Sequence, residues 1–359
     1  MLKTLDRYII KKFLSTFIVA LGMFIMIAIV FDVVEKLEDF LSDQIPLSEI
    51  LFDYYLNFIP YFAVQFTPLF LFIAVIFFTS RMAYRSEIVA VLNSGITFNR
   101  FLVPYFISAL LVTALNIFAN LWLIPDANKT RLAFEDAHIG YTPHNPDNNI
   151  HFQIARNEFI YMENFNLADS SGYKFAFEKF DNGKLLYKLR ADRIQWEGKK
   201  KLWEVKNYAE RTNDSLNETL RFGKDSLIKY NFTPSDLKRD VNAMEALNAP
   251  ELNAKIAELK MRGADNVSFY EVEKYKRTAF PFAIPILTLI GVSLSSRKVR
   301  GGSGLHIGIG IALSFTYIMF QQVSKTFSTN GNLPALIGVW IPNIIFGPVA
   351  VFLYRLAPK

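Results

Sequence analysis

The first half of the chain carries the segment SRMAYRSEIVAVLNSGITFNR (residues 80–100) between two long apolar runs, residues 56–79 and 101–124. Each run has roughly the 20 residues that a helix needs to cross the hydrocarbon core of a bilayer. The segment between them contains Arg81, Arg85 and Arg100, and short loops rich in arginine tend to stay in the cytoplasm. We therefore predict a cytoplasmic loop that joins two membrane-spanning helices.

The loop has the pattern of a short amphipathic helix. Apolar residues and one arginine recur in it at helical spacing: Arg85, Ile88, Val89, Leu92 and Ile96. Gly95 is typical of the residue that follows the C-terminal end of a helix. Such a helix lies either against the membrane interface or against a soluble partner protein, and the pattern alone leaves both possibilities open.

The composition indicates a membrane protein. Hydrophobic residues make up 52% of the 359 residues, and 34 of them are phenylalanines, which is high for a soluble globular chain. The net charge of +6 comes from basic residues that flank apolar runs, so membrane orientation explains it better than binding to nucleic acid. The chain has no cysteine, which excludes disulfides and thiolate metal sites.

Six membrane-spanning helices are predicted in all, at about residues 13–34, 56–79, 101–124, 278–295, 305–323 and 333–353. The basic residues before the first run resemble a signal peptide. The run is too long for one, however, and no small-residue cleavage site follows it, so we expect it to be retained. Both termini are then predicted to lie in the cytoplasm.

Between the third and fourth spans the chain changes character. Short alternating segments rich in β-formers occur at about residues 149–155, 158–165, 173–180, 184–191, 202–211 and 216–222. The sequence Asp181-Asn182-Gly183 is a strong hairpin signal. We predict an all-β, jellyroll-like domain over residues 126–232 and a helical connector over residues 233–277. These separate a first transmembrane half (residues 1–125) from a second (residues 278–359), and the count of spans places the inserted domain outside the cytoplasm.

Familiar catalytic signatures are missing from the sequence. It contains no G-x-x-x-x-G-K-[ST] phosphate loop, no H-E-x-x-H and no G-x-S-x-G. Residues 301–304 (GGSG) are predicted to form a turn. The four histidines are scattered, at His138, His144, His151 and His306, so we expect neither a metal site nor a cofactor, and nothing calls for an enzyme.

Cations gather at the outer ends of several predicted spans: Lys129, Arg131, Lys274, Lys276, Arg277 and Lys325. Either a large translocated domain relaxes the orientation rule, or these side chains attract the phosphates of a lipid headgroup. Asp32, at the outer end of the first span, is either an interfacial carboxylate or part of a translocation path. Gln321 and Gln322 either hold helices together or line a cavity.

The order of these parts resembles the LptF/LptG permease family of the lipopolysaccharide exporter. Three short stretches carry the resemblance: LDRYI at residues 5–9, RSEIV at residues 85–89 followed by Ser94-Gly95, and the lead-in to the fourth span with Glu271, Lys276-Arg277, Ala279 and Pro281. The resemblance covers essentially the whole chain, and its first ten residues favour LptG over LptF.

The resemblance implies a permease subunit in the bacterial inner membrane, with the β-domain in the periplasm. In the family, a dimer of LptB ATPases binds below a heterodimer of LptF and LptG. ATP-driven closure pushes the coupling helices and expels lipopolysaccharide towards a periplasmic bridge that includes LptC. ATP is bound by the partner, so this chain would have no catalytic role and no cofactor.

The family's coupling helix corresponds to residues 80–95, which we call the coupling segment. Its implied contacts with the ATPase are Arg85, Ser86, Glu87, Ile88 and Leu92. One departure concerns Asp32, since some LptG proteins carry a lysine near this position that is thought to meet the lipid. Two other functions stay open: a membrane anchor whose β-domain recruits envelope proteins, and a membrane-embedded enzyme that acts on lipids.

Overall fold

The computed structural model describes residues 3–42, 45–139, 149–181, 183–214, 217–237, 241–262, 266–297 and 303–357. His144, Asn182 and the Gly301–Gly302 part of the predicted turn lie outside these residues. The chain divides into two compact units. The helical unit comprises Met1–Ile139, Glu245–Pro250 and Glu271–Lys359, and the β-unit comprises Gly140–Met244 and Glu251–Tyr270.

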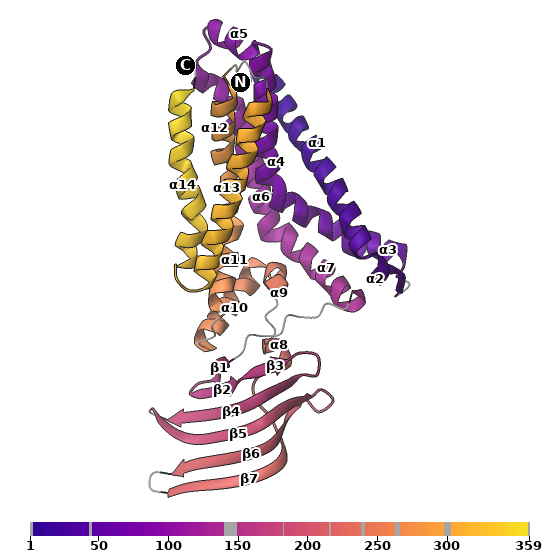
Figure 1. Cartoon of the computed structure of the whole chain (residues 1–359), viewed down its shortest axis with the longest axis vertical. Helices are drawn as coiled ribbons and strands as arrows, with labels where there is room; N and C mark the ends of the chain where they lie inside the picture. Colours follow the sequence, from indigo (N-terminus) through magenta and orange to yellow (C-terminus); the bar gives the residue numbers. More distant parts are fainter. Residues whose placement is uncertain are drawn as a thin grey trace. The chain divides into compact units, whose positions relative to one another are not determined.

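The six predicted spans are confirmed as helices that are long and apolar enough to cross a membrane, within the residues that the structure describes. They contain the helices α1 (Thr4–Glu35), α4 (Leu56–Tyr84), α6 (Phe98–Phe118), α12 (Ala283–Ser295), α13 (Ser303–Thr329) and α14 (Ala335–Leu356). The short α12 reaches spanning length only together with the helical residues before it, Val267–Ser295. The start of α1 and the end of α14 lie at the same end of the helical unit as the short helix α5 (Glu87–Asn93) (Figure 1).

Short helices extend the spans at the opposite end of this unit. The helices α2 (Leu37–Ser42) and α3 (Leu47–Glu49) and the π-helix η1 (Ile50–Tyr55) connect α1 to α4. A second π-helix, η2 (Ala119–Leu123), leads from α6 into α7 (Ile124–His138). The fourth span is preceded by α11 (Val267–Ala279) and the 3-10 turn η3 (Phe280–Phe282).

The β-domain was predicted to begin at residue 126, but helix α7 occupies the residues after this position. Helical structure continues to His138, and the first strand begins only at Ile150. Pro125 lies in the first turn of α7, where proline is tolerated because its missing N–H would have no partner in the helix. The helical stretch Phe98–His138 continues through Pro125, so the proline does not end the helix of the third span.

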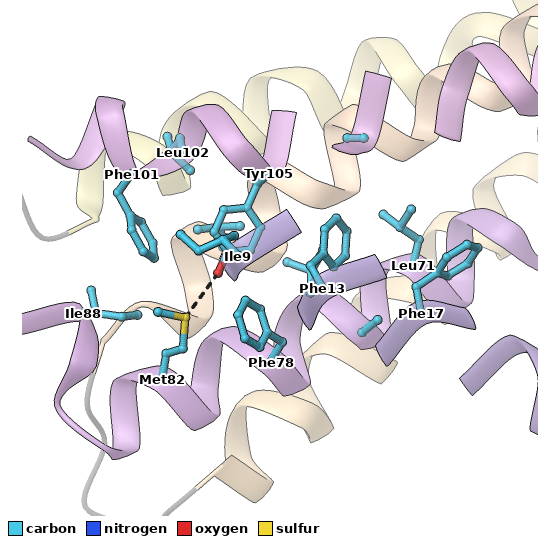
Figure 2. Packing of buried hydrophobic residues seen from close by; sticks show 14 of the residues in the cluster. Ile9, Phe13, Phe17, Leu71, Phe78, Met82, Ile88, Phe101, Leu102 and Tyr105 are labelled. Carbon is cyan, nitrogen blue, oxygen red and sulfur yellow. Dashed lines mark hydrogen bonds between the residues drawn. The ribbon is translucent and has the colours of Figure 1, made fainter. Parts of the chain in front are cut away.

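The core of the helical unit lies where α1, α4 and α6 meet. Ile9 and Phe13 of α1 are fully buried there with Leu71 of α4 and with Phe101 and Tyr105 of α6 (Figure 2). Much of the outward half of α1 is exposed in contrast, including Met26 at 61% and Phe31 at 72%. Apolar side chains on a spanning helix face lipid or another membrane helix, so this exposure fits a membrane-embedded unit.

The predicted all-β region is confirmed, and its strands form one seven-stranded antiparallel sheet (Figure 1). The strands are β1 (Ile150–Ala155), β2 (Glu158–Met162), β3 (Asn164–Asn166), β4 (Ser171–Asp181), β5 (Lys184–Glu197), β6 (Leu202–Asp214) and β7 (Asn217–Ile228). Their order is β1-β2-β4-β5-β6-β7, with β3 paired to β4. Asp181 pairs with Lys184 at the predicted hairpin, where Gly183 has a positive φ of 79°.

The segment that follows β7 covers the apolar face of the sheet. Phe232 stacks on Trp203 at 4.6 Å between ring centroids, and the indole Nε1 of Trp203 donates a hydrogen bond to the Phe232 carbonyl at 2.9 Å. Tyr230 packs on Phe175 and Phe177. Burial raises the pKa of the Tyr230 hydroxyl well above its usual range, so this phenol stays neutral at physiological pH.

Three more helices complete the predicted connector: α8 (Pro234–Leu237), α9 (Val241–Ala246) and α10 (Ala249–Arg262). Leu237 is buried in the same cluster as Trp203 and Phe232. The β-unit thus has an apolar core of its own, which follows from the alternation of buried and exposed residues along β4 and β5.

Candidate functional site

The coupling segment forms a helix-turn-helix at one end of the helical unit. Helix α4 ends at Tyr84, Ser86 turns the chain with a left-handed φ of 60°, and α5 follows over Glu87–Asn93. The predicted C-terminal cap is confirmed, because Gly95 has a φ of +86° and donates its N–H to the Leu92 carbonyl at 3.1 Å. A glycine adopts this conformation without the steric cost that other residues meet.

Apolar side chains anchor α5 to the core. Ile88 is 1% exposed and belongs to the same buried cluster as Ile9, Met82 and Phe101 (Figure 2). The neighbouring Val89 is 48% exposed, although the sequence pattern placed it on the same stripe. Leu92 is partly buried and packs against this cluster. Ile88 and Leu92 therefore hold the helix in place.

The charged residues of the segment face outwards. Arg85 Nη1 lies 3.9 Å from Glu87 Oε1, with side chains 54% and 33% exposed. The hydroxyl of Tyr8, from α1, donates to Glu87 Oε2 at 3.4 Å. Exposed pairs of this kind contribute little to stability.

A second candidate site is a polar cavity of about 220 Å³ within the helical unit, called the polar cavity below. It is lined by residues of α4, α7, α11, α12, α13 and α14, of η2 and η3, and by Glu245. Its apolar wall includes Phe66, Leu69 and Leu287, and Gln321 and Gln322 line it as one of the two sequence hypotheses expected. Its charged lining consists of Glu245, Glu273, Lys276, Arg277 and Lys325.

Two of the predicted lipid-binding cations in the polar cavity have carboxylate partners. Lys276 Nζ lies 3.3 Å from Glu273 Oε2 and 3.5 Å from Glu245 Oε1. Arg277 is 3% exposed, contacts Glu273 Oε1 at 3.1 Å and donates to the Leu247 carbonyl at 2.7 Å. These bonds tie the chain around residue 245 to the start of the fourth span.

Lys325, from α13, lines the same cavity but has different charged neighbours. No carboxylate lies within ion-pair distance of its ammonium among the residues described here. Lys274 is exposed beside the ring of Tyr275, at 5.6 Å, and does not line the cavity.

The remaining predicted residues lie on α1 and α7. Asp32 accepts hydrogen bonds from Tyr54 at 3.0 Å and Tyr55 at 3.1 Å, and it pairs with Lys36 at 3.2 Å. These contacts join α1 to η1. They engage both of its carboxylate oxygens.

The two basic residues of α7 differ in environment. Arg131 pairs with Glu135 at 3.5 Å and stacks on the ring of Tyr61 at 4.9 Å, and Tyr61 lines the polar cavity. Lys129 is exposed and does not line it. The structure therefore brings Lys276, Arg277 and Lys325 together, with Arg131 behind Tyr61.

Sequence reasoning missed the two acids of the cavity. Glu273 lies three and four residues before Lys276 and Arg277, a spacing that places opposite charges side by side on a helix. This pattern was visible in the sequence. The contact of Glu245 with Lys276 joins residues 31 positions apart and has no local signal.

Comparison with known proteins assigns the chain to a family. The family described as lipopolysaccharide export system permease LptF/LptG matches residues 7–356. A comparison with curated proteins gave no match. The family match includes all six membrane helices and the whole β-sheet. The chain therefore belongs to the LptF/LptG family of lipopolysaccharide export system permeases.

Proposed function

We propose that this chain is a membrane-spanning subunit of an ABC transporter that extracts lipopolysaccharide from the inner membrane and passes it to a periplasmic bridge. The proposal rests on the structure of the coupling segment. Ile88 is buried in the core while Arg85 and Glu87 are exposed beside it. A helix anchored through one face and charged on the other is suited to transmit a push from a bound protein.

The partner at the coupling segment would be an LptB-like ATPase dimer, which binds and hydrolyses the ATP. The chain itself would act as a permease rather than an enzyme. A second permease, LptF-like or LptG-like, would complete the membrane part, and the assignment of this chain as LptG stays a prediction. An LptC-like protein would receive the lipid beside the β-unit, which we place in the periplasm.

The polar cavity would receive an anionic group of the lipid, with Lys325 as its cation. Lys276 and Arg277 would shape the cavity while paired to Glu273. Charge-assisted bonds between an ammonium and phosphate oxygens are among the stronger polar contacts in proteins. Lys129, Arg131, Lys274 and Asp32 would have at most a supporting part, since none of them lines the cavity.

Reconstitution tests this function. The complex purified from cells is placed in vesicles with lipopolysaccharide, and ATP-dependent transfer of the lipid to a purified bridge protein is measured. The proposal expects transfer that requires ATP and the ATPase subunit. A chain that purifies without an ATPase in mild detergent would instead support the membrane anchor, and lipid turnover by the chain alone would support the enzyme.

A further inference from the structure

We propose that the ion pair between Asp6 and Arg100 fastens the first span, α1, to the coupling segment, so that both move as one body during the ATPase cycle. This inference rests on the proposed function, because it takes the coupling segment as the place where force enters. Asp6 and Arg100 would be positioning residues, since they act through α1 and α5 rather than on the lipid.

The guanidinium of Arg100 and the carboxylate of Asp6 form a bidentate ion pair. Arg100 Nη1 donates to Asp6 Oδ1 at 2.8 Å, and Nη2 donates to Oδ2 at 2.5 Å. The backbone N–H of Lys3 donates to Asp6 Oδ2 as well, at 2.8 Å. Asp6 is only 2% exposed. Two parallel bonds fix orientation as well as distance, and a buried carboxylate that lost its cation would be strongly disfavoured.

The position of the pair connects it to the coupling segment. Arg100 lies in the first turn of α6, which begins soon after α5 ends at Asn93. Thr97 caps this turn by accepting the N–H of Arg100 at 3.4 Å. A displacement of α5 is therefore passed along a very short stretch of chain to Arg100, and through Arg100 to Asp6 on α1.

The helix α1 also meets the start of the segment. Tyr8 contacts Glu87 in the first turn of α5, and Ile9 is buried in the same cluster as Ile88 (Figure 2). The start of α1 thus contacts the coupling segment directly through Tyr8, and the first turn of the next helix, α6, through Asp6. The outward half of α1 is largely exposed, so these contacts at its inner end are well placed to determine how it moves.

Asp6 and Arg100 have a second possible role, which is to stabilise the fold without transmitting movement. The two roles differ in the distance between α1 and α5 during the cycle. If the pair fastens the two helices, that distance is the same with and without nucleotide. If the pair serves stability alone, the distance changes when the ATPase closes, whether or not the pair is present.

The chain has no cysteine, so spin labels can be placed by Lys11→Cys on α1 and Val89→Cys on α5, both exposed positions. The labelled chain is studied in the whole complex with its ATPase, without nucleotide and with ATP trapped. We expect one unchanged label distance in the otherwise native chain. In Asp6→Asn and in Arg100→Gln we expect the distribution of label distances to broaden and its mean to shift when ATP is trapped.

Two further variants keep the test decisive if a single substitution unfolds the protein. Arg100→Lys keeps the charge but loses the fork, and we expect a smaller shift. The exchange of both residues, Asp6→Arg with Arg100→Asp, should restore the unchanged distance. A label distance that changes with ATP in the native chain overturns the proposal, and so does an unchanged distance in folded Asp6→Asn. Lipid transfer is measured in a separate assay. A failure of the proposed export function can therefore be told apart from a failure of the proposal about Asp6 and Arg100.

Discussion

Lys276 and Lys325 line one cavity of the helical unit, but only Lys276 lies within ion-pair distance of carboxylates among the residues that the structure describes. The two lysines therefore have different expected roles, although the sequence presented both as cations at the outer ends of spans. Lys276 pairs with acids of the protein, whereas we expect Lys325 to pair with a ligand.

Replacement of each lysine should separate these roles. Lys325→Gln should lower lipopolysaccharide transfer several-fold without lowering thermal stability, because it removes a cation that has no acid partner in the described part of the protein. Lys276→Gln should lower stability by about 1–2 kcal/mol, since Glu273 and Glu245 lose a charged hydrogen-bond donor. Thermal unfolding in detergent and the transfer assay report the two effects. Equal transfer by Lys325→Gln and the native chain would remove Lys325 from the lipid site.

Charges on the coupling segment should matter for coupling and not for folding. Glu87→Ala and Arg85→Ala should reduce ATP-driven transfer at least about tenfold, which corresponds to a coupling free energy near 1.4 kcal/mol. Both side chains are substantially exposed, so the permease should unfold at its native temperature. Lys11→Ala, at an exposed position of α1, is the matched control and should transfer lipid normally. Native transfer by both test variants would contradict the role of the segment.

Ile88 should behave as a core residue. Ile88→Ala should cost about 2–5 kcal/mol of stability, the range measured for buried isoleucines replaced by alanine, because this side chain is 1% exposed. Val89→Ala, one residue further along the same helix and 48% exposed, should change stability much less. Thermal unfolding of the two variants side by side checks this, and a larger loss at Val89 would show that α5 is rotated from the position described.

The aromatic pair of the β-unit should hold its covering segment in place. Phe232→Ala should destabilise the β-unit by about 3–5 kcal/mol, since Phe232 is 2% exposed and stacks on Trp203. Tryptophan fluorescence during denaturation follows the change directly. Phe222→Ala, at a side chain 77% exposed, should leave the transition where it is in the native chain. An equal loss of stability in Phe232→Ala and Phe222→Ala would argue against the role of Phe232 in holding the segment that covers the sheet.

Close approach of α12 and α4 should depend on Gly291. A Cβ atom at this position would lie 2.8 Å from Val75 Cγ1 and 3.1 Å from the ring of Phe72, so Gly291→Ala should cost about 1–3 kcal/mol through overpacking. Gly347→Ala on α14 would meet no atom within 4 Å and serves as the control. Thermal unfolding in one detergent compares the two, and a native transition for Gly291→Ala would mean that the helices separate easily.

Much of the fold was predictable because its signals are local. Apolar runs of spanning length gave the six helices, and alternation with turn residues gave the strands. Gly95 was identified as a helix cap from its place after a periodic stretch, and its φ of +86° confirms this. Each of these features depends on a few neighbouring residues.

The parts that were not predicted depend on tertiary contacts or on a signal with two meanings. The third span is predicted to end at residue 124, before Pro125, but the helical stretch continues to His138, and a proline can stand inside a membrane helix as well as at its end. The exposure of Val89 beside the buried Ile88 depends on where α5 lies against α1. The pairing of Glu245 with Lys276 needs the fold itself. A list of basic residues alone does not show which of them the protein neutralises.

The central claim is that the coupling segment lies on the side of ATP and the β-unit on the opposite side of the membrane. Single cysteines test it most directly, because the chain has none of its own. Val89→Cys on α5 and Lys199→Cys between β5 and β6 both lie at exposed positions. Each variant is treated with a membrane-impermeant maleimide in cells whose outer membrane has been opened and whose inner membrane is intact. We expect labelling of Lys199→Cys at once and of Val89→Cys only after the inner membrane is broken, whereas labelling of Val89→Cys across an intact inner membrane would contradict the account.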